Sequence, residues 1–89
     1  MKTQVENMRS SNGNKVANQF IITDGNKMVF QSYGNVICVK DGRNVILDSR
    51  YWDYTQTTGK YRNRFLGETK ADTQKKIDSG VYKLANLNE

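Results

Sequence analysis

Hydrophobic and polar residues alternate along the first half of the chain in the pattern typical of short β-strands. β-branched and aromatic side chains hold many of the apolar positions, and such residues favour strands. Asp24-Gly25 and Asp41-Gly42 lie between these runs, and Asp-Gly is a strong hairpin signal because glycine accepts the positive φ of a tight turn. Four strands joined by tight turns predict an antiparallel meander. The predicted strands cover residues 16–23, 27–33, 35–40 and 44–48.

In the second half of the chain the periodicity becomes helical. Thr55, Thr57 and Thr58 can each offer an N-cap hydroxyl to a helix that we predict over residues 57–66. Gly67 suits the left-handed position that ends such a helix.

A second helix is predicted over residues 70–79. Thr69 is its N-cap, and Asp72 stands at the third helical position, where an acidic group completes a capping box. Gly80 follows the end of the helix, and residues 81–84 alternate again, as a short edge strand does. The expected fold class is therefore α+β, with a four-stranded antiparallel meander followed by two short helices and a short C-terminal strand.

The chain of 89 residues is long enough for one small domain and no second core. Residues 1–15 are mostly polar and end in a turn-like run, which predicts a flexible N-terminal arm. Residues 16–85 form the predicted α+β domain, and residues 86–89 are expected to fray.

Composition excludes several kinds of chemistry. The sequence contains no histidine and one cysteine, Cys38, so it has no intramolecular disulfide and no zinc site built from cysteine and histidine. Cys38 lies within a predicted strand and is interpreted as a buried hydrophobic residue. Carboxylates do not cluster as paired acid–base catalysts do. We therefore expect no enzymatic activity, no cofactor and no metal.

The formal net charge is +5, from 14 basic and 9 acidic residues. Such a balance favours polyanionic partners, although many domains with this charge bind none. No apolar run approaches the length of a membrane span, and no signal-peptide core is present. We expect a cytoplasmic protein with no membrane association.

The aromatic and basic segment over residues 52–66 is the most distinctive part of the chain. At helical spacing, Tyr61 and Phe65 fall on the face that would pack on the sheet, whereas Lys60 and Arg64 point outward. Arg62 falls on the core side and needs a carboxylate partner; Asp53 and Asp48 are the two nearest in sequence. The candidate binding residues are Arg50, Tyr51, Trp52, Tyr54, Lys60, Tyr61, Arg62 and Arg64.

Two interpretations of this segment remain open. Aromatic rings can stack on bases while Lys and Arg neutralise phosphates. The same aromatic side chains are also what a helix needs in order to dock on a sheet.

Residues 52–67 resemble a signature found in small uncharacterised proteins of bacteriophages and mobile elements. In that signature an aromatic-Asp-Tyr-Ser/Thr-x-Thr-Thr opening leads into Lys-Tyr/His-Arg-x-x-Phe-Leu. A Lys/Asp-Gly hairpin precedes it, as Asp41-Gly42 does here, and a Ser-Gly-x-Tyr helix end follows, as at residues 79–82. The resemblance implies an origin rather than an activity. Small phage proteins are often stoichiometric binders that blunt host systems, anti-CRISPR inhibitors among them.

Three hypotheses follow. The first is an inhibitor of a host defence system, acting in the cytoplasm of the bacterial cell by occupying a host protein surface such as that of a CRISPR nuclease. The second is an accessory protein that contacts DNA or RNA phosphates with its basic helix. The third is a structural part of a phage particle. The chain is expected to be a monomer, or a dimer formed through an exposed edge strand.

Overall fold

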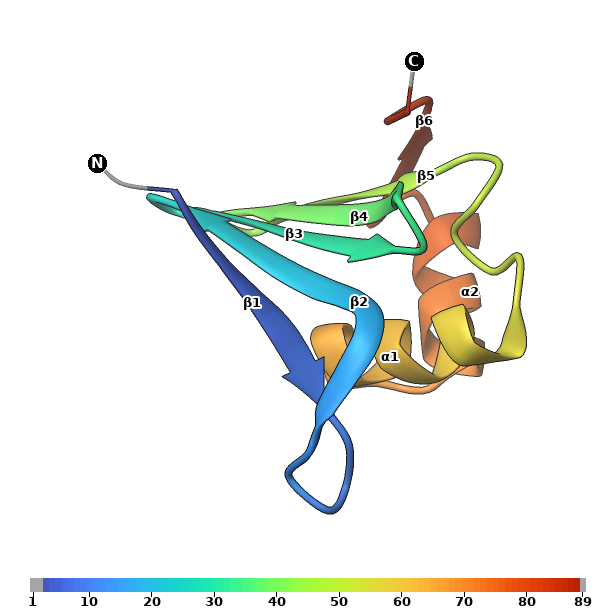
Figure 1. Cartoon of the computed structure of the whole chain (residues 1–89). Helices are drawn as coiled ribbons and strands as arrows, with labels where there is room; N and C mark the ends of the chain where they lie inside the picture. The colour runs from blue at the N-terminus through green and yellow to red at the C-terminus, as the bar shows by residue number, and fades with distance from the viewer. Residues whose placement is uncertain (1–2, 89) are drawn as a thin grey trace.

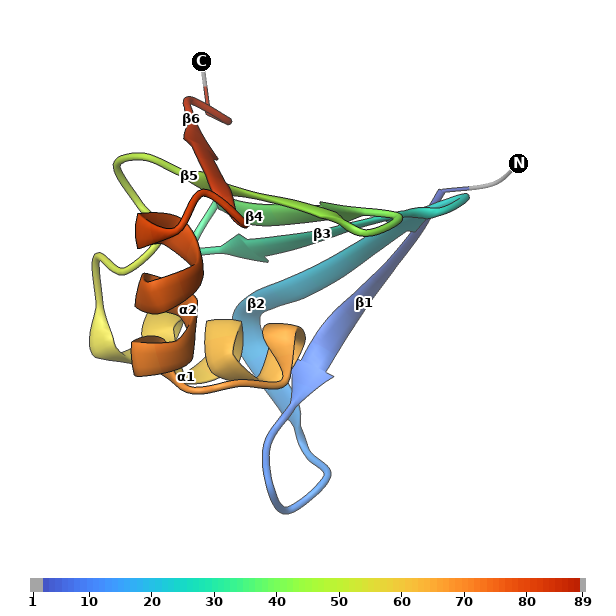
Figure 2. The ribbon, with the colours of Figure 1, turned by 180° about the vertical axis from the view of Figure 1, so that it is seen from behind.

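Two layers make up the fold, a six-stranded sheet and two helices that cover one of its faces (Figure 1). The computed structural model describes residues 3–88. The view from behind in Figure 2 also places both helices on the same side of the sheet. In chain order the elements are β1 (Gln4–Arg9), β2 (Lys15–Asp24), β3 (Lys27–Ser32), β4 (Asn35–Asp41), β5 (Asn44–Asp48), α1 (Gln56–Leu66), α2 (Lys70–Asp78) and β6 (Lys83–Ala85).

The sheet has the strand order β1-β2-β3-β4-β5-β6. Neighbours from β1 to β5 pair antiparallel, and β6 pairs parallel with β5. The predicted α+β class and the meander over β2–β5 are confirmed. Gly25 and Gly42 take φ angles of 63° and 62°, as the predicted hairpins require. β6 runs parallel because the chain crosses over through both helices before it returns to the sheet.

The N-terminal segment is not the flexible arm that its composition predicts. Residues 4–9 form β1, which pairs with β2 along its length. Met8 is 7% exposed and belongs to the core. A polar edge strand gains its order from backbone pairing with a neighbour, and this pairing leaves no hydrophobic pattern in the sequence. Residues 1 and 2 of the predicted arm lie outside the described residues.

The C-terminal segment is also tied down where fraying was predicted. The Leu87 amide donates to Asp48 Oδ1 at 2.8 Å. The Asn88 side chain donates from Nδ2 to the Val36 carbonyl at 2.8 Å and accepts from the Val36 amide at 2.5 Å. This side-chain amide therefore pairs with β4 as a neighbouring strand would. Glu89 lies outside the described residues.

Both helices begin and end close to their predicted positions. Of the three candidate caps for α1, Thr55 is the N-cap, and its hydroxyl accepts from the Thr58 amide at 2.9 Å. Gly67 ends α1 in the left-handed conformation with φ 69°. Thr69 and Asp72 form the predicted capping box of α2.

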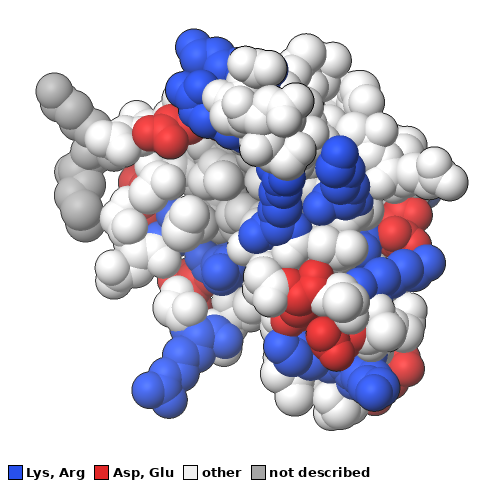
Figure 3. Space-filling model, turned by 90° about the horizontal axis from the view of Figure 1, so that it is seen from below, with Lys and Arg blue, Asp and Glu red and all other residues white. Residues whose placement is uncertain are grey.

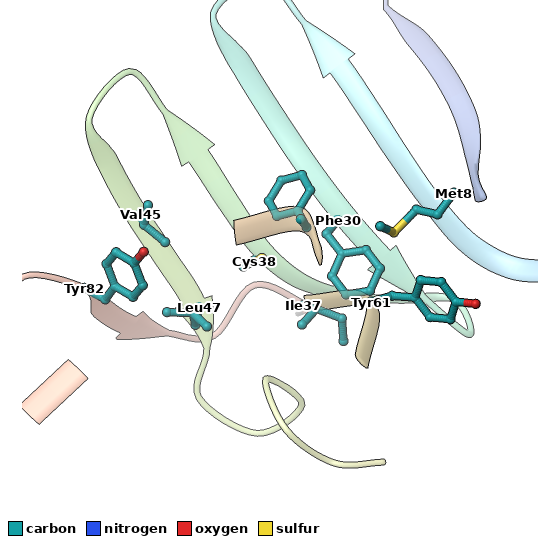
Figure 4. Close-up of a cluster of buried hydrophobic side chains, with 9 residues drawn as sticks. Met8, Phe30, Ile37, Cys38, Val45, Leu47, Tyr61 and Tyr82 are labelled. Atoms are coloured by element: carbon teal, nitrogen blue, oxygen red, sulfur yellow. The ribbon is translucent and has the colours of Figure 1, made fainter. Parts of the chain in front are cut away.

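The core lies between the sheet and α1 and extends to Tyr82 beside β6 (Figure 4). The rings of Phe30 on β3 and Phe65 on α1 stack with centroids 5.8 Å apart. A hydroxyl pair between Ser32 and Thr58, 2.9 Å apart, joins the same two elements. Cys38 is fully buried, and this burial raises the pKa of its thiol to about 12. The prediction that Cys38 acts as a buried hydrophobic residue is confirmed.

Candidate binding surface on helix α1

Arg62 is held inside the fold by a set of short contacts. Its side chain is 1% exposed, and Nη1 donates to Asp53 Oδ1 and to the Trp52 carbonyl, both at 2.8 Å. Nη2 donates to Asn63 Oδ1 at 2.9 Å, and the guanidinium lies 5.1 Å from the centroid of the Trp52 ring. Asp53 is thus the carboxylate that this core-facing arginine needs. Arg62 therefore connects Asp53, Trp52 and Asn63 in the interior.

Asp53 joins the two helices, because it also accepts from Lys70 Nζ at 2.6 Å. Partial burial acts to raise the pKa of Asp53, but hydrogen bonds from Lys70 and Arg62 outweigh it and hold the pKa below the ordinary value. Asp53 therefore stays ionised at neutral pH and anchors the start of α2 to α1.

Gly59 stands inside α1, where glycine lowers helix stability. A Cβ at this position would lie 3.2 Å from Asp53 Oδ1 and 3.7 Å from both terminal nitrogens of Arg62. The glycine leaves the room that the Asp53–Arg62 ion pair occupies. The sequence analysis did not predict this role of Gly59. A glycine inside a predicted helix, three residues before the core-facing Arg62, was the signal that could have indicated it.

The aromatic residues of the segment are mostly structural. Tyr61 is 5% exposed and lies in the core, and Trp52 is half-buried against it. Neither ring is open on both faces, so neither can stack between bases. These two residues pack α1 and the segment before it against the core.

Lys60 and Arg64 are exposed and point away from the core, as the helical spacing predicts. Their cationic groups lie 5.5 and 5.6 Å from the centroid of the Tyr61 ring. Arg64 Nη1 also donates to the backbone carbonyl of Arg9 on β1. Arg9 is the register partner of Lys15 on β2, and its Nη1 donates to the Gly13 carbonyl at 3.0 Å. The first hairpin, which carries these two cations, therefore contacts α1 through the Arg9 backbone.

We call this set of four residues, Arg9, Lys15, Lys60 and Arg64, the basic surface. None of the four takes part in an ion pair within residues 3–88. Figure 3, seen from below, shows Lys and Arg side chains spread across this side of the molecule, with Asp and Glu side chains mostly toward the right and some at the left. Glu6 lines the same cavity of about 300 Å³ as Arg9 and Lys15, so one carboxylate borders the basic surface.

The remaining predicted residues lie at the N-terminal end of α1. The rings of Tyr51 and Tyr54 meet edge to face with centroids 5.1 Å apart. Tyr54 is 37% exposed, and its hydroxyl donates to the Ser32 carbonyl at 3.3 Å. Exposed Arg50 and the Tyr51 ring line a cavity of about 310 Å³ beside the C-terminal segment. The eight predicted residues therefore divide into an interior group, an outward basic pair and a tyrosine-bearing end.

A cavity of about 640 Å³ opens beside the first turns of α1. Its only lining carboxylate, Asp53, already accepts from two cations, and no lining residue is a cysteine or histidine. The cavity is lined by Asp53, Tyr54, Thr55, Gln56, Gly59, Lys60, Arg62, Asn63 and Lys70.

Comparison with protein families matches residues 3–80 to DUF8033, a family of unknown function. The chain belongs to the DUF8033 family. No curated protein and no solved structure matches it. The family match begins before β1, which agrees with the place of that strand inside the domain.

Two further observations bear on this DUF8033 chain. In the part of the chain that the structure describes, no three residues of the metal-ligating types His, Cys, Asp and Glu come together as a metal site would require. Within the same residues, no helix is long and apolar enough to cross a membrane.

Proposed function

We propose that this DUF8033 chain is a non-enzymatic binding protein whose basic surface contacts a nucleic-acid backbone. The observation that supports it is the hydrogen bond from Arg64 on α1 to the Arg9 carbonyl, which joins two segments that each carry two exposed cations. Arg9 and Lys15 come from the first hairpin, and Lys60 and Arg64 come from α1. None is neutralised by an ion pair within residues 3–88.

The chemistry of these side chains favours phosphates over bases. Lys and Arg at exposed positions neutralise phosphate oxygens and release counterions. Base stacking needs open aromatic faces, and Tyr61 beneath the two cations is buried. Binding is therefore expected to depend weakly on sequence and strongly on salt.

Inhibition of a host defence system is the second candidate function. The tyrosine-bearing end favours it, because Tyr54 is 37% exposed, and Tyr33, which follows the Ser32 carbonyl that accepts from Tyr54, is 49% exposed. Tyrosine and arginine are enriched at interface centres. The nucleic-acid groove of a nuclease is itself basic, so the +5 charge of this chain does not complement such a groove. An anti-CRISPR type of contact would use the tyrosines and Arg50 on a different surface of the target.

Fluorescence anisotropy with labelled duplex and single-stranded DNA and RNA tests the first proposal. Four phosphate contacts give a log–log slope of affinity against salt of about −3.6 on duplex. The double substitution Lys60→Ala/Arg64→Ala should reduce the slope to about −1.8. The matched control, Lys75→Ala/Lys83→Ala, removes two exposed charges from α2 and β6 and should change it much less.

Absence of binding to every probe at low salt, or an equal effect of the control pair, rejects the nucleic-acid proposal. A stoichiometric complex recovered from nuclease-treated host lysate, and lost on Tyr54→Ala/Arg50→Ala substitution, would support the inhibitor instead. The third hypothesis, a part of a phage particle, has no observation in its favour.

A further inference from the structure

The face of the sheet opposite the helices carries a band of apolar side chains. Alternate residues of a strand point to opposite faces, and Phe30 on β3 faces the helices. Its neighbour Val29 therefore points away from them. Cross-strand register then places one aliphatic residue from each of five strands in a row with Val29. The row is Val5, Ile22, Val29, Val39 and Ile46.

Two further apolar residues, Phe20 and Val36, lie in the next row, since both pair with Gln31. We call these seven residues the outer band. None of them belongs to the buried core or packs against it, and Val5 is 61% exposed. Both ribbon views place the helices on the opposite side (Figures 1 and 2).

Charged residues border the outer band on three sides. Lys83 on β6 is the register partner of Ile46, and Val5 shares a cavity with Glu6, Arg9 and Lys15. The third border is a row of alternating charge at one end of the strands. Lys27 is the register partner of Asp24 on one side and of Asp41 on the other, and Asn44 completes this row. All four side chains are exposed, and none forms an ion pair within residues 3–88. The row thus reads negative, positive, negative, neutral from β2 to β5.

We propose that two copies of the chain associate through the outer band, about a two-fold axis parallel to the strands. The axis passes between β3 and β4. Rotation about it keeps the strand direction and reverses the strand order, so that β3 lies over β4 of the other copy. Val29 then meets Val39 of the partner subunit. Lys27 meets Asp41 of the partner subunit, and the symmetry forms this ion pair twice.

The complementary charges of Lys27 and Asp41 favour a second copy of this chain as the partner, and they favour this axis. An axis perpendicular to the strands would place the charged row over apolar Phe20 and Val36, where no opposite charge is available. A polyanion on the charged row would find Lys27 between two carboxylates. The cations Lys60 and Arg64 lie on the helix side, away from the contact between the two copies. The dimer therefore leaves Lys60 and Arg64 exposed on each of its outer sides.

The size of the outer band sets the strength of the contact. The outer band has two rows, and the charged row adds a third. Five strands about 4.8 Å apart and three rows about 7 Å apart give a footprint of at most roughly 500 Å² per copy. The total of about 1,000 Å² lies at the lower limit of specific interfaces. The dimer should therefore assemble reversibly, at micromolar or higher protein concentration.

Sedimentation velocity over about 1 µM to 1 mM protein tests the proposal. Val39→Glu should weaken association at least about tenfold, whereas the shape-preserving Val39→Thr should weaken it less. Lys27→Asp and Asp41→Lys should each weaken it, and the double swap Lys27→Asp/Asp41→Lys should restore it. Circular dichroism verifies that each variant is folded.

Since Lys27 and Asp41 are exposed, the charge-swap series remains informative even if Val39→Glu fails to fold. A monomer at all concentrations overturns the proposal. So does a dimer that the charge-swap series leaves unchanged, including one formed through the β1 edge. The result is separate from nucleic-acid binding, because Lys60 and Arg64 remain unaltered in every variant.

Discussion

At the scale of single residues, Arg62 shows how one side chain can change the meaning of a motif. Lys60, Arg62 and Arg64 look alike in sequence, yet only Arg62 is buried, with Asp53 at 2.8 Å. A buried ion pair contributes little against an apolar replacement of both partners, but removal of one partner leaves an uncompensated charge. Arg62 is therefore expected to affect stability, and its neighbours to affect binding.

Substitution of Arg62 by Ala should lower the free energy of unfolding by about 3–5 kcal/mol, because Asp53 and the Trp52 carbonyl lose their buried donor. Urea denaturation followed by circular dichroism measures the change. Lys60→Ala, on the exposed face of the same helix, should stay within about 0.5 kcal/mol of the native protein. Equal losses in the two variants would contradict the structural role of Arg62.

At the scale of elements, the first hairpin differs most from the prediction, because β1 forms where a flexible arm was expected. Figure 1 shows β1 and β2 bending round α1, and Asn18 in β2 has a positive φ of 66°. This bend brings Met8 into the core and Arg9 beside α1. The strand that composition suggested was an arm therefore closes one side of the core and supplies part of the basic surface.

Met8→Ala should lower the free energy of unfolding by about 2–5 kcal/mol, because it opens a cavity between β1 and the core. A flexible arm would tolerate the same change without cost. The control Glu6→Ala alters an exposed position on the same strand and should have little effect. Thermal denaturation compares the two variants. An unchanged melting temperature for Met8→Ala would support the flexible-arm prediction instead.

At the scale of the whole molecule, three buried or half-buried carboxylates connect segments that are distant in sequence. Asp48 accepts from the backbone amides of Leu87 and Tyr51. Asp53 joins α1 to Lys70. Glu68 accepts from Thr73 and Tyr82, at 2.5 and 2.9 Å, and from Lys76 at 2.6 Å. In each case burial acts to raise the pKa, but the donors outweigh it and hold the pKa below its ordinary value.

Acid should therefore destabilise the fold. A carboxyl group whose pKa is lower in the folded state stabilises the protein above the unfolded pKa, about 3.9 for Asp and 4.3 for Glu, and this contribution is lost as pH falls through the folded value. Urea unfolding between about pH 7 and pH 3 should show this loss. Glu68→Gln should be less stable at neutral pH and show a smaller loss in acid; an identical pH profile would contradict the contribution of Glu68.

Local features were predictable from sequence because their causes lie within a few residues. The Asp-Gly hairpins, the Thr69–Asp72 capping box and the glycine end of α1 depend on turn and cap chemistry between near neighbours. The alternation of β2–β5 identified the meander. The outward position of Lys60 and Arg64 followed from helical spacing, and Asp53 was one of two partners named for Arg62.

The remainder depended on pairings between distant residues, which leave no local pattern. The β1–β2 ladder needs only backbone groups, the Asn88 side chain completes β4 from 52 residues away, and Arg64 reaches Arg9 across 55 residues. Sequence alone thus determined the turns, caps, strand alternation and net charge of this protein. Tertiary structure decided which cations face solvent and how they combine, because burial and long-range hydrogen bonding exist only once the sheet has curled round α1.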